Sequence, residues 1–222
     1  TEAMARSSTA AAVQSFSPSV AADFAAKAVV AILLSAVLIL IYVGVRFNSV
    51  RYSAGALIAT LHDCVIALGF IALANLLAER APNIAGTLGI MPFKIDLNVI
   101  AAVLTILGYS LNDKIVVMDR IRENRGKLPH ASRRLINMSI NQTISRTIMT
   151  SMTTFLAAMV LYLFGGEAIR AFAYCFLIGV VVGTYSSVAI AAPFVWNRKF
   201  DKGDDGVAPA GAAVQTAAMA TA

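Results

Sequence analysis

Five long apolar runs, at residues 28–45, 54–77, 97–118, 140–164 and 171–196, constrain this chain more than any other feature. Each lies within or near the roughly 17–25 residues that an α-helix needs to cross a bilayer. Lipid offers no partners for backbone N–H and C=O groups, so such runs must form helices that satisfy those groups internally. The runs therefore predict an all-α, polytopic transmembrane helix bundle.

Composition agrees with a membrane protein. Hydrophobic residues make up 59% of the chain and charged residues 14%, whereas a soluble domain carries about 25% charged residues. The net charge of +6 would favour nucleic-acid binding in a soluble protein, but here most basic residues lie between the apolar runs. That placement is typical of residues that set topology against anionic lipid. We expect the bilayer as a partner and no nucleic acid.

Loop charge predicts the orientation of the bundle. Basic residues concentrate in the link after the first run, the link after the third run and the tail after the fifth run. They are Arg46, Arg51, Arg120, Arg122, Arg125, Lys127, Arg133, Arg134, Arg198, Lys199 and Lys202. The other two links hold only Arg80, Lys94 and Arg170. The positive-inside rule assigns the first group to the cytoplasm, so we expect an extracytoplasmic N-terminus and a cytoplasmic C-terminus.

The pattern divides the chain into three parts. Residues 1–26 are expected to be the end of an extracytoplasmic segment or linker, 27–200 the transmembrane bundle, and 201–222 a disordered cytoplasmic tail. The third helix is expected to continue out of the membrane to Arg125 and to stop at Gly126. Residues 79–96, which hold several Pro and Gly, are expected to form an ordered external loop.

Four ionisable residues lie inside the apolar runs: His62, Asp63, Asp113 and Arg146. Such groups cost several kcal/mol in lipid unless they are paired or hydrated, so each is a candidate for function. Lys114 is a fifth, although its long side chain is expected to reach the cytoplasmic surface. Cys64 and Cys175 are interpreted as small apolar residues of the bundle and not as a disulfide or metal pair.

Helix rise places Asp113 and Arg146 at one level, roughly 9 Å inside the cytoplasmic boundary, and Asp63 roughly 15 Å deep. Tyr109 and Ser110 precede Asp113 on the same side of its helix. Around Arg146, threonines recur at three- and four-residue spacing. They are Thr143, Thr150, Thr153 and Thr154. This polar stripe predicts a helix interface or a wet crevice.

Two interpretations of these charges remain open. In the first, Arg146 moves toward and away from Asp113 and so switches that carboxylate between releasing and holding a proton. In the second, the two residues form a static ion pair that holds helices together. For His62 and Asp63, polar contacts between helices are the leading interpretation. Small residues at Gly179 and Gly183 predict a helix-packing face.

The motif that carries Asp113 resembles a known family. Residues 108–124 read Gly-Tyr-Ser-Leu-Asn-Asp-Lys-Ile-Val-Val-Met-Asp-Arg-Ile-Arg-Glu-Asn, which closely resembles the signature of SecF in the SecD–SecF protein-export family. The segments 61–63 and 141–147 resemble the corresponding parts of two further SecF helices. The resemblance runs from about residue 17 to residue 200. Lys114 departs from the family pattern, which usually has a small polar residue there.

The resemblance implies a fold and a set of site residues. The fold is that of the resistance-nodulation-division superfamily, so the five spans are what is visible of a six-helix unit, in a chain that begins after a missing helix and external domain. Asp113 corresponds to the proton-carrying aspartate and Arg146 to its partner. The supporting polar residues are His62, Asp63, Tyr109, Ser110, Asn112, Gln142, Thr143 and Thr150.

The implied function is a proton-motive-force-driven accessory subunit of Sec-dependent protein export in the inner membrane of a bacterium. The implied partners are SecD, separate or fused, the SecYEG translocon, YidC and unfolded preproteins. We expect no enzyme activity, no metal and no cofactor, with the proton gradient as the energy source. The alternatives are a structural scaffold of the translocon, a lipid or small-molecule exporter of the same superfamily, and an intramembrane hydrolase that uses Asp63 and Asp113.

Overall fold

The computed structural model describes residues 18–87, 90, 92–93, 96–128 and 130–196. Within them the chain forms helices and no strand. The elements are α2 (Pro18–Phe47), α3 (Val50–Arg80), α4 (Pro82–Thr87), α5 (Leu97–Arg125), α6 (Arg133–Phe164), α7 (Glu167–Ser186), the π-helical η1 (Ser187–Ala191) and α8 (Ala192–Phe194). Both the first part of the predicted linker and the whole of the predicted tail lie outside the described residues.

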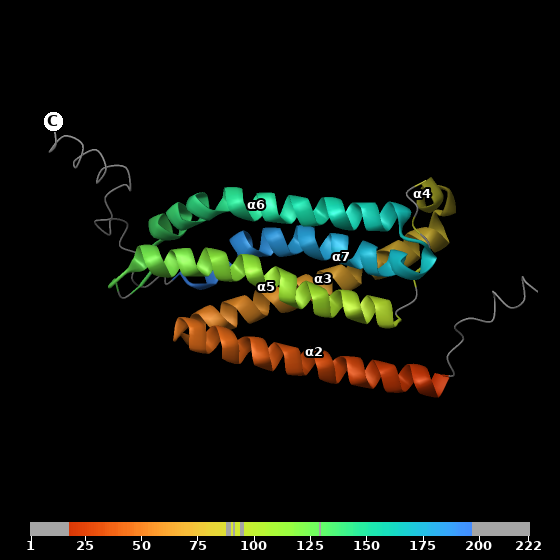
Figure 1. The fold of residues 1–222 in the computed structure, drawn as a ribbon, viewed down its shortest axis with the longest axis horizontal. Helices are drawn as coiled ribbons and strands as arrows, with labels where there is room; N and C mark the ends of the chain where they lie inside the picture. The colour runs from red at the N-terminus through yellow and green to blue at the C-terminus, as the bar shows by residue number, and fades with distance from the viewer. Residues whose placement is uncertain (1–17, 88–89, 91, 94–95, 129, 197–222) are drawn as a thin grey trace, which may run out of the picture.

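Five helices are long and apolar enough to cross a membrane: Ala26–Phe47, Val50–Arg80, Leu97–Arg125, Arg133–Phe164 and Glu167–Phe194. The prediction of an all-α, polytopic bundle is confirmed. The long helices run side by side along one axis (Figure 1). α7 packs against α3, α5 and α6, while α2 lies at one edge of the bundle against α3 and α5. Many apolar side chains of α2 are exposed, because this helix at the edge of the bundle faces lipid.

Capping residues set where the helices begin and end. The side chain of Asp96 accepts from the backbone N–H groups of Asn98 and Val99 at 3.0 and 3.2 Å, which starts α5. Ser132 starts α6 in the same way, by accepting from Leu135 N at 3.3 Å. Gly126 ends α5 with φ 52°, a left-handed conformation that favours glycine, as its sequence position predicted.

The contact between α7 and α5 depends on two glycines. A Cβ atom at Gly179 would overlap the side chain of Ile106, and one at Gly183 would lie 2.8 Å from Ser110 Oγ. The predicted packing face is confirmed, because α5 occupies the space that side chains at these positions would need. Both cysteines are buried and free, as expected.

We expect Gly179→Val to lower the thermal stability of the full-length protein in detergent, because the added side chain must displace Ile106 from the α5–α7 contact. Gly69→Val is the matched control, since a Cβ atom at Gly69 meets nothing within 4 Å. The midpoint of thermal unfolding, measured by loss of the monodisperse peak in size-exclusion chromatography, distinguishes the two variants. Equal midpoints would contradict the proposed packing role.

The two ends of the bundle differ in chemistry. At one end Arg46 Nη2 lies 3.2 Å from Asp119 Oδ1, and the Arg133 guanidinium lies 4.8 Å from the centre of the Trp196 ring. At the other end Asn75 brackets Phe93, donating to its carbonyl at 2.9 Å and accepting from its N–H at 2.7 Å. The contact between Asn75 and Phe93 orders the described part of the predicted external loop. Arg46 and Arg133 lie together at the opposite end, in agreement with the grouping of basic residues expected from the loop charges.

Candidate functional site

Asp63 lies at the centre of a buried polar network between three helices. Its side chain, on α3, has no exposed surface. Asp63 Oδ2 accepts from Ser110 Oγ, from Lys114 Nζ at 2.6 Å and from Ser186 Oγ at 2.8 Å. The other carboxylate oxygen, Oδ1, lies 3.2 Å from Nδ1 of the partly exposed His62. The network joins α3 to α5 and to the end of α7, so Asp63 does form the polar contact between helices that was predicted for it.

Lys114 does not reach the cytoplasmic surface, and that prediction is wrong. Its side chain is fully buried and pairs with Asp63. Its ammonium also donates to Ser110 Oγ and to the Ser110 carbonyl oxygen at 3.3 Å. The physical reason is that an opposite charge lies within reach inside the bundle. A paired, fully bonded ammonium is more stable there than one that stretches through apolar side chains toward water.

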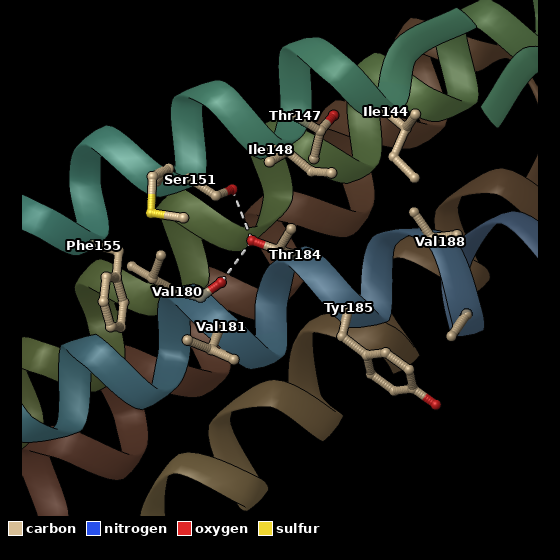
Figure 2. Close-up of a pocket in the computed structure, with 12 residues that line it drawn as sticks. Ile144, Thr147, Ile148, Ser151, Phe155, Val180, Val181, Thr184, Tyr185 and Val188 are labelled. Atoms are coloured by element: carbon tan, nitrogen blue, oxygen red, sulfur yellow. Dashed lines mark hydrogen bonds between the residues drawn. The ribbon is translucent and has the colours of Figure 1, made fainter. Parts of the chain in front are cut away.

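Asp113 is 3% exposed and lies one residue from Lys114, on the side of α5 that faces α6. Its Oδ2 accepts from Ser151 Oγ at 3.1 Å, and Ser151 Oγ in turn lies 2.7 Å from Thr184 Oγ1. In Figure 2 the Ser151 and Thr184 hydroxyls point toward each other across the gap between α6 and α7. Asp113 is therefore attached to a short chain of neutral hydroxyl groups.

This hydroxyl pair lies in the wall of an open apolar cavity of about 510 Å³ between α6 and the C-terminal half of α7. Side chains such as Ile148, Phe155 and Val181 line most of it (Figure 2). Because Ser151 lines the cavity and bonds to Asp113, a single hydroxyl group separates this surface groove from the Asp113 carboxylate.

The predicted contact between Asp113 and Arg146 is absent from this structure. Arg146 is exposed, and no ion pair in the described part of the chain includes either residue. The residue of α6 that reaches Asp113 is Ser151. Ser151 lies five positions after Arg146, which corresponds to about 7.5 Å along the helix and about 140° around it. The two side chains therefore leave α6 at different levels and on different faces.

The remaining predicted residues divide into two groups. Ser110 joins the Asp63 network, and Thr143 is buried on α6, where its hydroxyl donates to Ser139 O at 3.0 Å. The others lie elsewhere. Asn112 and Thr150 are exposed, Tyr109 is half-buried with its hydroxyl 3.4 Å from the Thr150 carbonyl, and Gln142 accepts from Arg120 Nε at 2.7 Å near the basic end.

The polar stripe of α6 was located only in part. The buried stripe has a strict four-residue spacing and consists of Ser139, Thr143, Thr147 and Ser151. Thr150, Thr153 and Thr154 fall beside it, and their hydroxyls donate to carbonyls of their own helix. Four-residue spacing is the stronger sequence signal, because residues at i and i+4 share one face of a helix.

Sequence reasoning also missed Ser186 and the segment that follows it. Ser186 is the last residue of α7, and the π-helical turn η1 begins at Ser187. Such π-turns inside α-helices are frequent at functional sites. Sequence reasoning placed Asp63 deeper than Asp113. Asp63 bonds to Ser110, which lies three residues, or about 4.5 Å of helix rise, before Asp113 on α5, and the long Lys114 side chain reaches back to the same level.

The arrangement gives two buried carboxylates different environments. Asp63 has the Lys114 ammonium and two hydroxyl donors, whereas Asp113 accepts from one neutral hydroxyl. Buried ionisable residues within a helix bundle are characteristic of membrane proteins that move ions or protons along internal paths. Fold and site thus define a polytopic helical membrane protein with a buried charged centre.

Residues 1–201 match the family model described as protein export membrane protein SecD/SecF, C-terminal, and the chain belongs to this family. The protein translocase subunit SecF of Rickettsia rickettsii is 43% identical over 189 residues, which cover 83% of this chain and 56% of that protein. The Rickettsia prowazekii subunit is 42% identical over 189 residues, with 83% and 55% covered. The chain therefore spans about half the length of the curated relatives it matches.

A solved structure agrees with this relationship. The crystal structure of SecDF from Thermus thermophilus, described as a translocon-associated membrane protein, is similar with a TM-score of 0.61 and 41% sequence identity. The similarity covers 76% of this chain and 21% of that one. The resemblance inferred from residues 108–124 is thereby confirmed.

Proposed function

We propose that the protein of which this chain is part assists Sec-dependent protein export and is driven by the proton-motive force. One observation supports this most strongly: Asp113 is buried within the bundle, accepts a hydrogen bond from the neutral Ser151 hydroxyl and belongs to no ion pair in the described residues. Buried carboxylates within transmembrane helices are typical of the proton relays of pumps and transporters.

Proton binding is proposed to act through α6. A neutral Asp113 keeps its contact with Ser151, while an ionised Asp113 attracts the guanidinium of Arg146. Because Arg146 now leaves α6 about 7.5 Å from the level of Ser151, that attraction favours a different position or rotation of α6 relative to α5. Protonation thus biases a bundle with two states, and domains attached to the helices move with it.

The proposed partners follow from the family and from the length of its members. The relatives include SecF subunits and a SecDF chain, so we propose SecD, separate or fused, as the direct partner. SecYEG, YidC and unfolded preproteins are proposed as the further partners in a bacterial inner membrane. The N-terminus is proposed to lie outside the cytoplasm and the C-terminus inside, because basic residues gather at one end of the bundle.

Inverted membrane vesicles that contain the full-length protein and the translocon test the proposal. Completion of preprotein export is measured with and without a protonophore. We expect Arg146→Ala to remove most of the gradient-dependent fraction, because an ionised Asp113 then has no partner to draw α6. Arg134→Ala, another exposed arginine of α6 but at its first turn, is the control and should retain that fraction. Full activity of Arg146→Ala would contradict the two-state relay.

The alternatives have less support. A hydrolase that used Asp63 and Asp113 as an acid–base pair would need both carboxylates available, yet three donors, one of them the Lys114 ammonium, occupy Asp63 Oδ2. A scaffold would not require a buried carboxylate without a counter-ion, which is costly to a fold that gains nothing from it.

A further inference from the structure

Lys114 fills a site whose geometry suits a small cation. Its Nζ is surrounded by three oxygen atoms: Asp63 Oδ2 at 2.6 Å, Ser110 O at 3.3 Å and Ser110 Oγ. An ammonium has three N–H donors, and each has an acceptor here. The site is sealed, because neither Lys114 nor Asp63 nor Ser110 has exposed surface.

The ligand atoms are those that bind alkali and alkaline-earth cations. A carboxylate, a hydroxyl and a backbone carbonyl are hard oxygen donors. Ser186, which donates to the same Asp63 oxygen at 2.8 Å, stands where α7 passes into η1, so a fourth oxygen lies beside the set.

We propose that the oxygens of Asp63 and Ser110 form a binding site for a small monovalent cation such as Na⁺, and that the protein fills it with its own Lys114 ammonium. Free Na⁺ is therefore excluded from this part of the bundle. The consequence for coupling rests on the proposed function: with Asp63 paired to Lys114, Asp113 is the carboxylate left to bind the coupling ion.

The same geometry explains why the two carboxylates have different surroundings. A lysine at position 114 points about 100° away from Asp113 around α5, toward α3. It meets Asp63 there and leaves Asp113 to Ser151 on α6. Of these two adjacent residues of α5, Lys114 thus pairs with the carboxylate on α3, while Asp113 is itself the carboxylate that contacts α6.

Thermal unfolding of the purified full-length protein in equal concentrations of NaCl, NH₄Cl and choline chloride tests the site. The wild type should unfold at the same temperature in all three salts. Lys114→Ala vacates the site, so Na⁺ or ammonium should raise its midpoint by about 3 °C or more over choline, the shift expected for a cation in about tenfold excess over its Kd.

Two controls define the ligand atoms. Lys114→Met is neutral but keeps the space filled, so its midpoint should not depend on the cation. Lys114→Ala combined with Asp63→Asn removes the anionic ligand and should lose the cation effect. A cation-independent Lys114→Ala, or a wild type that Na⁺ stabilises equally, would overturn the proposal.

A second variant covers the case in which Lys114→Ala does not fold. Lys114→Ser keeps an oxygen near the site, and it should be recovered in NaCl or NH₄Cl more readily than in choline chloride. Failure of both variants to fold in all three salts also overturns the proposal, because an added cation should then restore them. This experiment measures stability and not export. If Asp113 proved irrelevant to export, the proposed function would be wrong, but the cation site would not be affected.

Discussion

Asp113→Asn is expected to abolish gradient-driven export while leaving the bundle folded. Asparagine has nearly the shape of aspartate, and its amide oxygen can accept the hydrogen bond that Ser151 Oγ now donates to Asp113 at 3.1 Å. The substitution therefore preserves the contact with α6 and removes only the ability to bind and release a proton. Because the proposed coupling consists of that one change in charge, no partial activity is expected from it.

The measurement is the gradient-dependent fraction of preprotein export in inverted vesicles. Asp119→Asn is the matched control, because it makes the same chemical change six residues along α5, in an ion pair whose side chains are about half exposed. We expect it to retain the gradient response. If Asp113→Asn exported normally, the protein would be a scaffold and not an energy-coupled subunit.

The helices were predictable because their cause is local. An apolar run of membrane length has few alternatives to a helix, and Gly126 ends α5 where a left-handed residue is needed. What the apolar pattern missed are the helical turns outside it, such as the start of α6 at Arg133. Those turns depend on the cap at Ser132, a polar signal that hydropathy does not register.

The positions of the buried charges were predictable, but their pairing was not. Asp63, Asp113, Lys114 and Arg146 all stand out as charges within apolar runs. Two acids and two bases can be paired in more than one way, and the choice depends on how each helix is rotated about its axis. Depth estimates from helix rise carry an error of about one turn, which is enough to align Asp113 with Arg146 in place of Ser151.

The hydroxyl groups of the site were the least visible in the sequence. Ser151, Thr184 and Ser186 lie in apolar helices where serine and threonine are common, often bonded to their own backbone. Their roles follow from tertiary contacts: Gly183 allows α7 to approach Ser110 closely, and that approach brings Ser186 to Asp63. A helix-packing motif was recognised, but its consequence for the site required the fold.

The buried pair of Asp63 and Lys114 predicts a second large effect, on stability. Removing one partner leaves an uncompensated charge in the bundle, which typically costs 3–5 kcal/mol, so Lys114→Met and Asp63→Asn should each lower the free energy of unfolding by about that amount. The exposed pair of Arg46 and Asp119 is the control. Arg46→Gln should cost no more than about 1 kcal/mol, because water screens both charges.

The double variant Asp63→Asn with Lys114→Met separates charge pairing from packing. It contains no unpaired charge, its asparagine can still accept from Ser110 and Ser186, and methionine occupies the volume of the lysine stem. We therefore expect it to regain most of the stability that either single variant loses, as measured by reversible unfolding of the full-length protein in mixed detergent micelles. If the two losses were additive, the side chains would stabilise the bundle separately and the ammonium would not be the partner of Asp63.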